Sequence, residues 1–148
     1  MVEKEHTLRQ LSVFLLNRPG ALAEVARCLA DHNINLRAFT LSETREFGTM
    51  RIIVDDADKA VEVLTKAGHH FNEVDVLGVE VPDRPGGMAE VVEKLTAEQI
   101  NVEYAYTMVI TLRKKALTIL RVDDLYKAVT ILKNDGRHLL TEKELKAL

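Results

Sequence analysis

The chain has 148 residues, with 20 Lys or Arg, 23 Asp or Glu and a formal net charge of −3 at pH 7. Charges of both signs are interspersed, so no basic patch indicates nucleic acid, and no stretch reaches the roughly 18 apolar residues of a membrane span. The single cysteine, Cys28, has no partner for a disulfide within the chain, a pattern typical of cytoplasmic proteins. We expect a cytoplasmic protein that binds neither nucleic acid nor a membrane.

The first elements are a strand and a helix joined by a tight turn. Residues 11–16 are apolar and predict a buried strand, which the following Asn-Arg-Pro-Gly sequence ends as a turn. Pro19 suits the start of a helix, because its fixed φ and missing N–H cost nothing there. An apolar stripe at helical spacing follows, made of Leu22, Val25, Ala26 and Leu29. We expect this stripe to pack on a sheet.

A β-hairpin and a second helix come next. Strands over residues 34–41 and 50–54 are joined by a polar turn that contains Gly48. Asp56 or Asp58 caps the second helix and Gly68 ends it. The residues predicted to face inward on this helix are Ala60, Val61, Leu64 and Ala67. A last strand starts at about Phe71 and runs into the next strand without a linker.

The same series of predicted elements then occurs a second time along the chain. Residues 17–36 match residues 83–102 at nine of 20 positions, where unrelated segments share roughly one or two. Residues 55–64 align with 123–132 at an offset two residues larger, so the second copy has two extra residues in the intervening loop. At the end, Thr141 and Glu144 fit a capping box before a short helix. We therefore expect two α+β domains, residues 1–75 and 76–148, each a ferredoxin-like βαββαβ unit with both helices on one face of an antiparallel sheet.

The Asn/Asp-Arg-Pro-Gly turn after the first strand, followed by Ile-Asn after the helix, resembles the ACT domain. Duplicated and joined to no enzyme, the chain resembles a stand-alone tandem ACT-domain protein, from about residue 11 to residue 140. The resemblance implies a regulatory amino-acid-binding module. It also implies that the ligand sits where two units meet, held by the loop after the first strand and by the start of the second strand.

The candidate ligand residues follow from this resemblance and from the chemistry of the turn. A glycine turn lets backbone approach a ligand, and the helix N-terminus after it offers N–H groups to a carboxylate. Asn17 and Asn35 match ligand contacts of amino-acid-binding ACT domains. Because Asp83 replaces the first Asn in the second copy and can only accept hydrogen bonds, we expect the first copy to bind more tightly. The candidates are Asn17, Arg18, Pro19, Gly20, Ala21, Leu22 and Asn35 in the first copy, and Asp83, Pro85, Gly86, Gly87, Met88 and Asn101 in the second.

Several of these residues also fit purely structural roles. Asn35 and Asn101 are equally suited to hydrogen-bonding backbone at the turn between helix and strand. Tyr104 and Tyr106 alternate onto one face of a strand, where they fit ordinary sheet packing or an aromatic wall for a ligand. His70 and His138 occupy equivalent positions, but no His or Cys lies at metal-ligand spacing, so a structural role is predicted and no metal is expected.

The leading interpretation is a regulator that senses a free amino acid, preferably apolar or aromatic, and modulates a partner enzyme of amino-acid metabolism. The alternative is a structural assembly module with a vestigial ligand site, which the Asp83 departure favours. A catalytic function is not expected, because the sequence offers no nucleophile paired with a base, no metal cluster and no phosphate loop; no cofactor is expected either. Exposed strand edges of such sheets pair, which predicts a homodimer.

Overall fold

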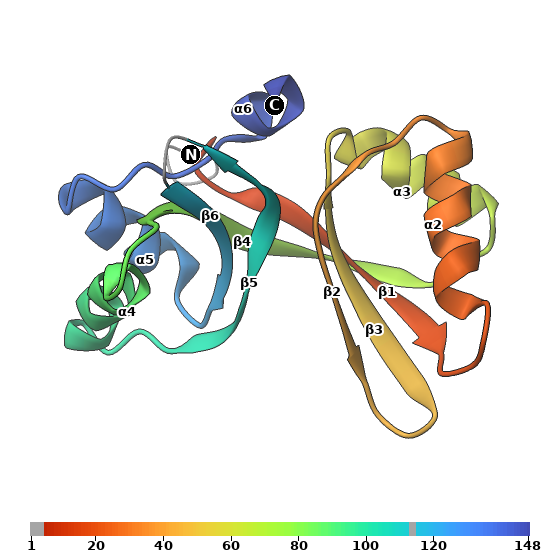
Figure 1. Cartoon of the computed structure of the whole chain (residues 1–148), viewed down its shortest axis with the longest axis horizontal. Coiled ribbons are helices and arrows are strands. Elements are labelled where there is room, and N and C mark those ends of the chain that lie inside the picture. Colours follow the sequence, from red (N-terminus) through yellow and green to blue (C-terminus); the bar gives the residue numbers. More distant parts are fainter. Residues whose placement is uncertain (1–4, 113–114) are drawn as a thin grey trace. The chain divides into compact units, whose positions relative to one another are not determined.

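The computed structural model describes residues 5–112 and 115–148. It divides into two compact units: the first-repeat unit of residues 9–74 with 146–148, and the second-repeat unit of residues 75–145 with the segment ending at Leu8. The elements in chain order (Figure 1) are β1 (Leu8–Leu16), α2 (Ala21–Asp31), β2 (Leu36–Glu43), β3 (Phe47–Val54), α3 (Ala57–Lys66), β4 (Phe71–Pro82), α4 (Gly87–Ala97), β5 (Val102–Leu112), β6 (Lys115–Val122), α5 (Leu125–Asn134) and α6 (Glu142–Ala147).

The first-repeat unit is an antiparallel sheet with two helices on one face. Strand β3 lies between β1 and β2 and pairs with both in antiparallel register. Helices α2 and α3 lie beside each other over this sheet (Figure 1). Strand residues Leu11 and Ile52 and helix residues Val25 and Leu64, all almost fully buried, belong to one core cluster. Burial of this apolar layer provides the main stabilisation of the unit.

The second-repeat unit repeats this arrangement. Strand β6 lies between β4 and β5, and helices α4 and α5 pack against the sheet through a second core cluster. Its closing strand is reduced to an isolated bridge between Val79 and Leu139. In both repeats, an equivalent backbone hydrogen bond joins the first strand to the last segment. The N–H of Phe14 donates to the carbonyl of His70 (2.9 Å), and the N–H of Glu80 donates to the carbonyl of His138 (3.1 Å). The predicted pair of ferredoxin-like βαββαβ units is confirmed.

Two features of the connections match the sequence-based predictions. Strand β4 is continuous from Phe71 to Pro82, so the last strand of the first repeat runs directly into the first strand of the second. The two extra residues of the second repeat lie in its hairpin. Leu41 pairs with Met50 in the first repeat, and their equivalents Thr107 and Thr118, two residues further apart, pair in the second.

The predicted caps also form. Asp56, and not Asp58, caps α3, because its carboxylate accepts the N–H of Lys59 at 3.1 Å. The capping box of α6 is complete: Thr141 Oγ1 accepts the N–H of Glu144 at 3.1 Å, and Glu144 Oε1 accepts the N–H of Thr141 at 3.2 Å. Each reciprocal bond satisfies a backbone N–H that the helix itself leaves unpaired.

The predicted start of the first helix is wrong by two residues. Helix α2 begins at Ala21, because Gly20 has φ 91° and ψ −20°, a left-handed conformation that cannot continue a right-handed helix. Pro19 therefore belongs to the turn. Leu22, predicted to face inward, is 40% exposed, while Ala21 takes the buried position in the first turn.

Three further predictions on the first repeat need correction. The second strand begins at Leu36 and not at residue 34, because the N–H of Ile34 still bonds the carbonyl of Leu29 at the end of the helix. Gly48 lies in β3, paired with Leu15, and not in the turn. On α3, Val63 is buried in addition to the predicted Leu64, and Ala67, predicted to face inward, is exposed at the C-cap.

Candidate functional site

The two Arg-Pro-Gly turns have the same backbone geometry. Gly20 and Gly86, with φ of 91° and 85°, are the N-caps of α2 and α4. The N–H of Arg18 donates to the carbonyl of Leu16, and that of Arg84 to the carbonyl of Pro82, both at 2.9 Å. Neither glycine has a side chain to cap its helix. The first N–H of each helix donates instead to the turn, from Ala21 to the carbonyl of Arg18 at 3.3 Å and from Gly87 to the carbonyl of Arg84 at 3.0 Å.

The arginine of each turn is held against the helix that follows it. Arg18 Nη2 lies 3.2 Å from Glu24 Oε1, and Arg84 Nη2 lies 2.7 Å from Glu90 Oε1. In each case Nη1 also donates to the carbonyl of the following proline, at 3.3 and 3.4 Å. The duplicated arginine is thus a brace of the turn, its charge compensated by a carboxylate one helical turn away.

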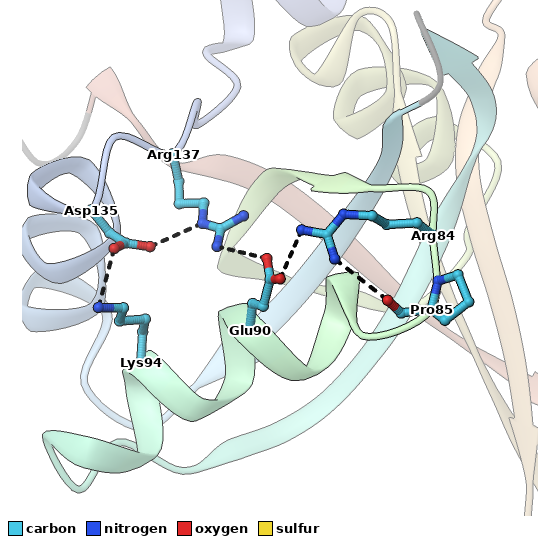
Figure 2. A network of polar contacts seen from close by, with 6 residues as sticks. All are labelled: Arg84, Pro85, Glu90, Lys94, Asp135 and Arg137. Carbon is cyan, nitrogen blue, oxygen red and sulfur yellow. Dashed lines mark hydrogen bonds and ion pairs between the residues drawn. The ribbon is translucent and has the colours of Figure 1, made fainter.

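In the second repeat this brace extends into a larger charge network (Figure 2). Glu90 also meets Arg137 Nη2 at 3.5 Å, Arg137 Nε meets Asp135 Oδ2 at 3.0 Å, and Lys94 Nζ lies 3.3 Å from Asp135 Oδ1. The hydrogen bond from Arg84 lowers the pKa of Glu90, with a further contribution from Arg137. The hydrogen bond from Arg137 lowers the pKa of Asp135 in the same way, helped by Lys94. The network therefore favours the ionised form of both carboxyl groups.

A cavity lies beside each turn, in equivalent places of the two units. The first-repeat pocket has a volume of about 110 Å³ and the second-repeat pocket about 330 Å³. Their linings correspond in part, because Ala21 and Glu43 line only the first-repeat pocket and Ala105, Tyr106 and Thr118 line only the second. The first-repeat pocket is lined by residues that include Leu15, Asn17, Leu22, Leu41 and Gly48, and the second-repeat pocket by their equivalents Val81, Asp83, Met88, Thr107 and Ala116.

Some of the predicted site residues line these pockets and others do not. Asn17, Arg18, Ala21 and Leu22 line the first-repeat pocket, and Asp83 and Met88 line the second, joined there by Arg84. Within each unit the turn residues and the Ile-Asn residues lie at opposite ends of an 11-residue helix, about 16 Å long. The predicted residues outside the two linings are Pro19, Gly20, Asn35, Pro85, Gly86, Gly87 and Asn101.

The three asparagines have defined structural contacts. The N–H of Asn35 donates to Asp55 Oδ1 at 3.1 Å and its carbonyl accepts the N–H of Asp55 at 3.1 Å, and Asn101 and Asp123 repeat this pair. In both cases the backbone makes the turn contact and the residue stays exposed. Asn17 differs, because its side-chain amide donates to Glu43 Oε2 and to the carbonyl of Arg45, both at 3.3 Å, tying the turn to the β2–β3 hairpin.

Residues on the strands complete the second-repeat pocket and were missed by the sequence analysis. They are Val81 and Pro82 on β4, Ala105 and Thr107 on β5, and Ala116 and Thr118 on β6; Arg84 was also left out of the candidates. Tyr106, one of the two tyrosines considered as a ligand wall, lines this pocket as well. Alignment of the two repeats could have indicated these residues, because Thr107 and Thr118 replace the large apolar residues Leu41 and Met50.

The other residues with reactive side chains have structural positions. Cys28 is half-buried and packs against the first-repeat core. His138 Nε2 lies 2.6 Å from Glu144 Oε2, so it supports the capping box of α6. Within residues 5–112 and 115–148, no group of three His, Cys, Asp or Glu side chains is placed to hold a metal ion. In the same ranges no helix is long and apolar enough to cross a bilayer.

Comparison with solved structures identifies the relatives of this fold. The chain is 36% identical to protein BT0572 from Bacteroides thetaiotaomicron, with 97% of this chain and 98% of that chain covered and a TM-score of 0.90. The ligand-free regulatory subunit of aspartate kinase from Thermus thermophilus is 17% identical over 85% of this chain and 91% of that chain, with a TM-score of 0.58. That of Thermus flavus is 16% identical over 86% and 92%, with a TM-score of 0.53. The last two likenesses are likenesses of fold.

A search of the curated proteins finds no match. A family model described as an ACT domain pair, in contrast, matches residues 6–148, almost the whole chain. This match agrees with the duplicated βαββαβ units and the paired Arg-Pro-Gly turns. The chain belongs to the ACT domain family, as a tandem pair of ACT domains.

Proposed function

We propose that this protein is a regulator that binds a free amino acid beside an Arg-Pro-Gly turn. Binding changes the packing of its domains or subunits, and a partner responds to this change. The observation that supports the proposal is the presence of equivalent cavities at the two turns, each beside a glycine-capped helix start. Pockets of this kind, concave and largely apolar with a few polar groups, are the usual form of small-molecule sites.

The geometry fits the two charged groups of an amino acid. The uncapped first turn of α2 or α4 offers N–H groups and partial positive charge to an α-carboxylate. Asn17 and Asp83, at the rim of their pockets, offer acceptors to an ammonium group. The site residues proposed for ligand contact are therefore those of the turns and the strands beside them.

We further propose that the protein is non-catalytic and cytoplasmic, and that its partner is an enzyme of amino-acid metabolism. The fold is shared with regulatory subunits of aspartate kinase, which supports a regulatory role. The cytoplasmic assignment rests on the single cysteine, which leaves no disulfide to form within the chain.

An assembly module is the second candidate, and one surface favours it. Phe14, Leu16 and Phe47 lie on the face of β1 and β3 away from the helices and are 47%, 54% and 55% exposed. Adjacent exposed apolar side chains of this size mark an interaction surface. We propose that a second copy of the chain covers them, so a homodimer serves both candidate functions.

A thermal-shift screen of the twenty amino acids tests the regulatory function. A ligand present at a hundred times its dissociation constant stabilises the folded protein by about 2.7 kcal/mol, and the melting temperature should rise by several degrees. The D-enantiomer of the best ligand is the control, because it has the same charges and a different shape. If no amino acid raises the melting temperature, the amino-acid function fails and the assembly module is the better account.

A further inference from the structure

The two pockets differ threefold in size, and the difference decides which of them can hold a ligand. Small-molecule sites have volumes of about 300 to 1,000 Å³. The second-repeat pocket, at about 330 Å³, lies within this range, and the first-repeat pocket, at about 110 Å³, lies well below it. By volume, the second-repeat pocket and not the first has the size of a small-molecule site.

Particular replacements on the strands accompany the difference in volume. Leu41 and Met50 face each other across β2 and β3, and their equivalents across β5 and β6 are Thr107 and Thr118. Two positions before Thr107, Ala105 stands where the first repeat has Phe39. All three replacements are smaller, and all three residues line the second-repeat pocket. At these three positions the second repeat has less side-chain volume, whereas Tyr106 and Ala116 are larger than their equivalents Thr40 and Gly48.

One lining side chain of the first-repeat pocket is held in place by hydrogen bonds. The Asn17 side chain bridges to Glu43 and to the Arg45 carbonyl across the pocket edge formed by the hairpin. Met50, in the position of Thr118, is 1% exposed and belongs to the first-repeat core. Enlarging this pocket would require breaking hydrogen bonds and opening a packed core.

The second-repeat pocket combines apolar walls with two threonines and one carboxylate, and it is also lined by Tyr106 and Arg84. Val81, Met88 and Ala116 provide apolar surface, and Thr107 and Thr118 provide hydroxyls. Thr118 is only 5% exposed, so a polar group placed against it is removed from water and gains from a hydrogen bond. Asp83 lies at the rim, where Arg84 is already bound by Glu90 at 2.7 Å.

Building on the proposed amino-acid binding, we infer that the second-repeat pocket is the principal ligand site and takes an amino acid whose short side chain ends in a hydroxyl or amide. Asp83 meets its ammonium group, and Thr107 and Thr118 meet the polar end of its side chain. This ligand class and this repeat differ from the sequence-based expectation of an apolar ligand bound mainly by Asn17.

The test fills the pocket with residues that the chain itself uses. The variant carries Ala105→Phe, Thr107→Leu and Thr118→Met, the first-repeat residues at equivalent positions. Its control carries Thr130→Leu, the same type of exchange at an exposed position on α5 that lines neither pocket. By calorimetry with the best ligand of the screen, the filled variant should lose affinity tenfold or more, and the control should stay close to wild type.

A milder variant keeps the test valid if the filled variant does not fold. Thr118→Val preserves the shape and removes only the hydroxyl, and it should lower affinity for a hydroxyl or amide ligand by about tenfold. Near-isosteric ligand pairs give the complementary measurement. Threonine should bind the wild-type protein about tenfold more tightly than valine, or asparagine more tightly than leucine.

The possible results separate this inference from the proposed function. If the filled variant still binds the ligand and Asn17→Ala does not, the ligand binds in the first repeat. That result contradicts the inference but is compatible with the proposed function. Valine or leucine binding as tightly as its polar counterpart overturns the assigned ligand class. The absence of binding by every amino acid removes the proposed function together with the inference.

Discussion

At the scale of single residues, comparison of the two repeats shows at which positions an added side chain would clash with its neighbours. Gly87 begins α4, and a Cβ added to it would lie 2.0 Å from the Pro82 carbonyl oxygen, closer than any real contact. Its equivalent in the first repeat is Ala21, so the second turn lies nearer to its helix than an alanine allows. Gly48 is the opposite case. A Cβ there meets its nearest neighbour, a backbone oxygen, at an ordinary 3.4 Å, and the second repeat has Ala116 at that position.

We therefore expect Gly87→Ala to destabilise the protein although alanine is the better helix former. Relieving a clash with backbone costs about 1 to 3 kcal/mol, which exceeds the gain of at most about 1 kcal/mol from helix propensity. Gly48→Ala, the matched control, should be neutral or slightly stabilising, because it only restricts the unfolded chain. Urea unfolding of both variants measures the difference, and equal stabilities would show that the second turn has room for a side chain.

At the scale of elements, the charge network of the second repeat joins helix α4 to the segment after α5. Glu90 contacts both Arg84 at the turn and Arg137 after α5. The first repeat keeps only the first part of this arrangement, Arg18 with Glu24. The positions of Lys94, Asp135 and Arg137 are taken there by Cys28, Ala67 and His69. The network thus adds to the second repeat a link between the pocket rim and the C-terminal part of its fold.

We expect this network to make stability depend on pH on the acid side. The pKa values of Glu90 and Asp135 are lowered in the folded protein, so below their usual values of 4.5 and 3.8 the unfolded chain binds protons first. The contribution of these two carboxylates to the free energy of unfolding is therefore complete above about pH 5. It is lost as the pH falls below their usual pKa values. Glu90→Gln should lower stability at pH 7 and flatten the decline between pH 5 and pH 3.

The control for this experiment is Glu24→Gln, which removes the equivalent carboxylate of the first repeat. Among the contacts of the described residues Glu24 meets one arginine, where Glu90 meets two. Its substitution should therefore change the pH profile less. Melting temperatures recorded from pH 3 to pH 7 decide the matter, and parallel profiles for wild type and Glu90→Gln would mean that the network makes no contribution to folding.

At the scale of the whole molecule, the exposed face of β1 and β3 predicts self-association. A chain of 16.7 kDa should sediment at twice its mass at tens of micromolar protein, with Phe14, Leu16 and Phe47 covered by the second copy. Phe14→Lys or Phe47→Lys should shift the equilibrium to the monomer, because a charge would be buried in an apolar contact. Tyr126→Lys, at a 53% exposed position on α5, is the control. A wild-type monomer, with and without ligand, would contradict the dimer.

The local pattern of the sequence determined the duplicated fold. Helix stripes, caps and turn residues act over a few positions, so the Thr141–Glu144 box and Gly68 could be assigned without any tertiary contact, and the cap of α3 could be narrowed to Asp56 or Asp58. The repeat alignment located the two extra residues in the second hairpin for the same reason. Errors occurred at element ends, where Gly20 moved the helix start past Pro19 and pairing with Leu15 drew Gly48 into a strand.

Only the tertiary structure determined which residues form a pocket and how large it is. Ala105, Thr107 and Thr118 are distant from the Asp83 turn in sequence, and strand pairing brings them to one cavity. Read alone, each is an ordinary strand residue. The size of a cavity depends on the summed volumes of side chains from several strands and a helix, because protein interiors are close-packed and a few missing methylene groups leave a void. A motif therefore marked the turn, and packing decided how large the pocket beside each turn is.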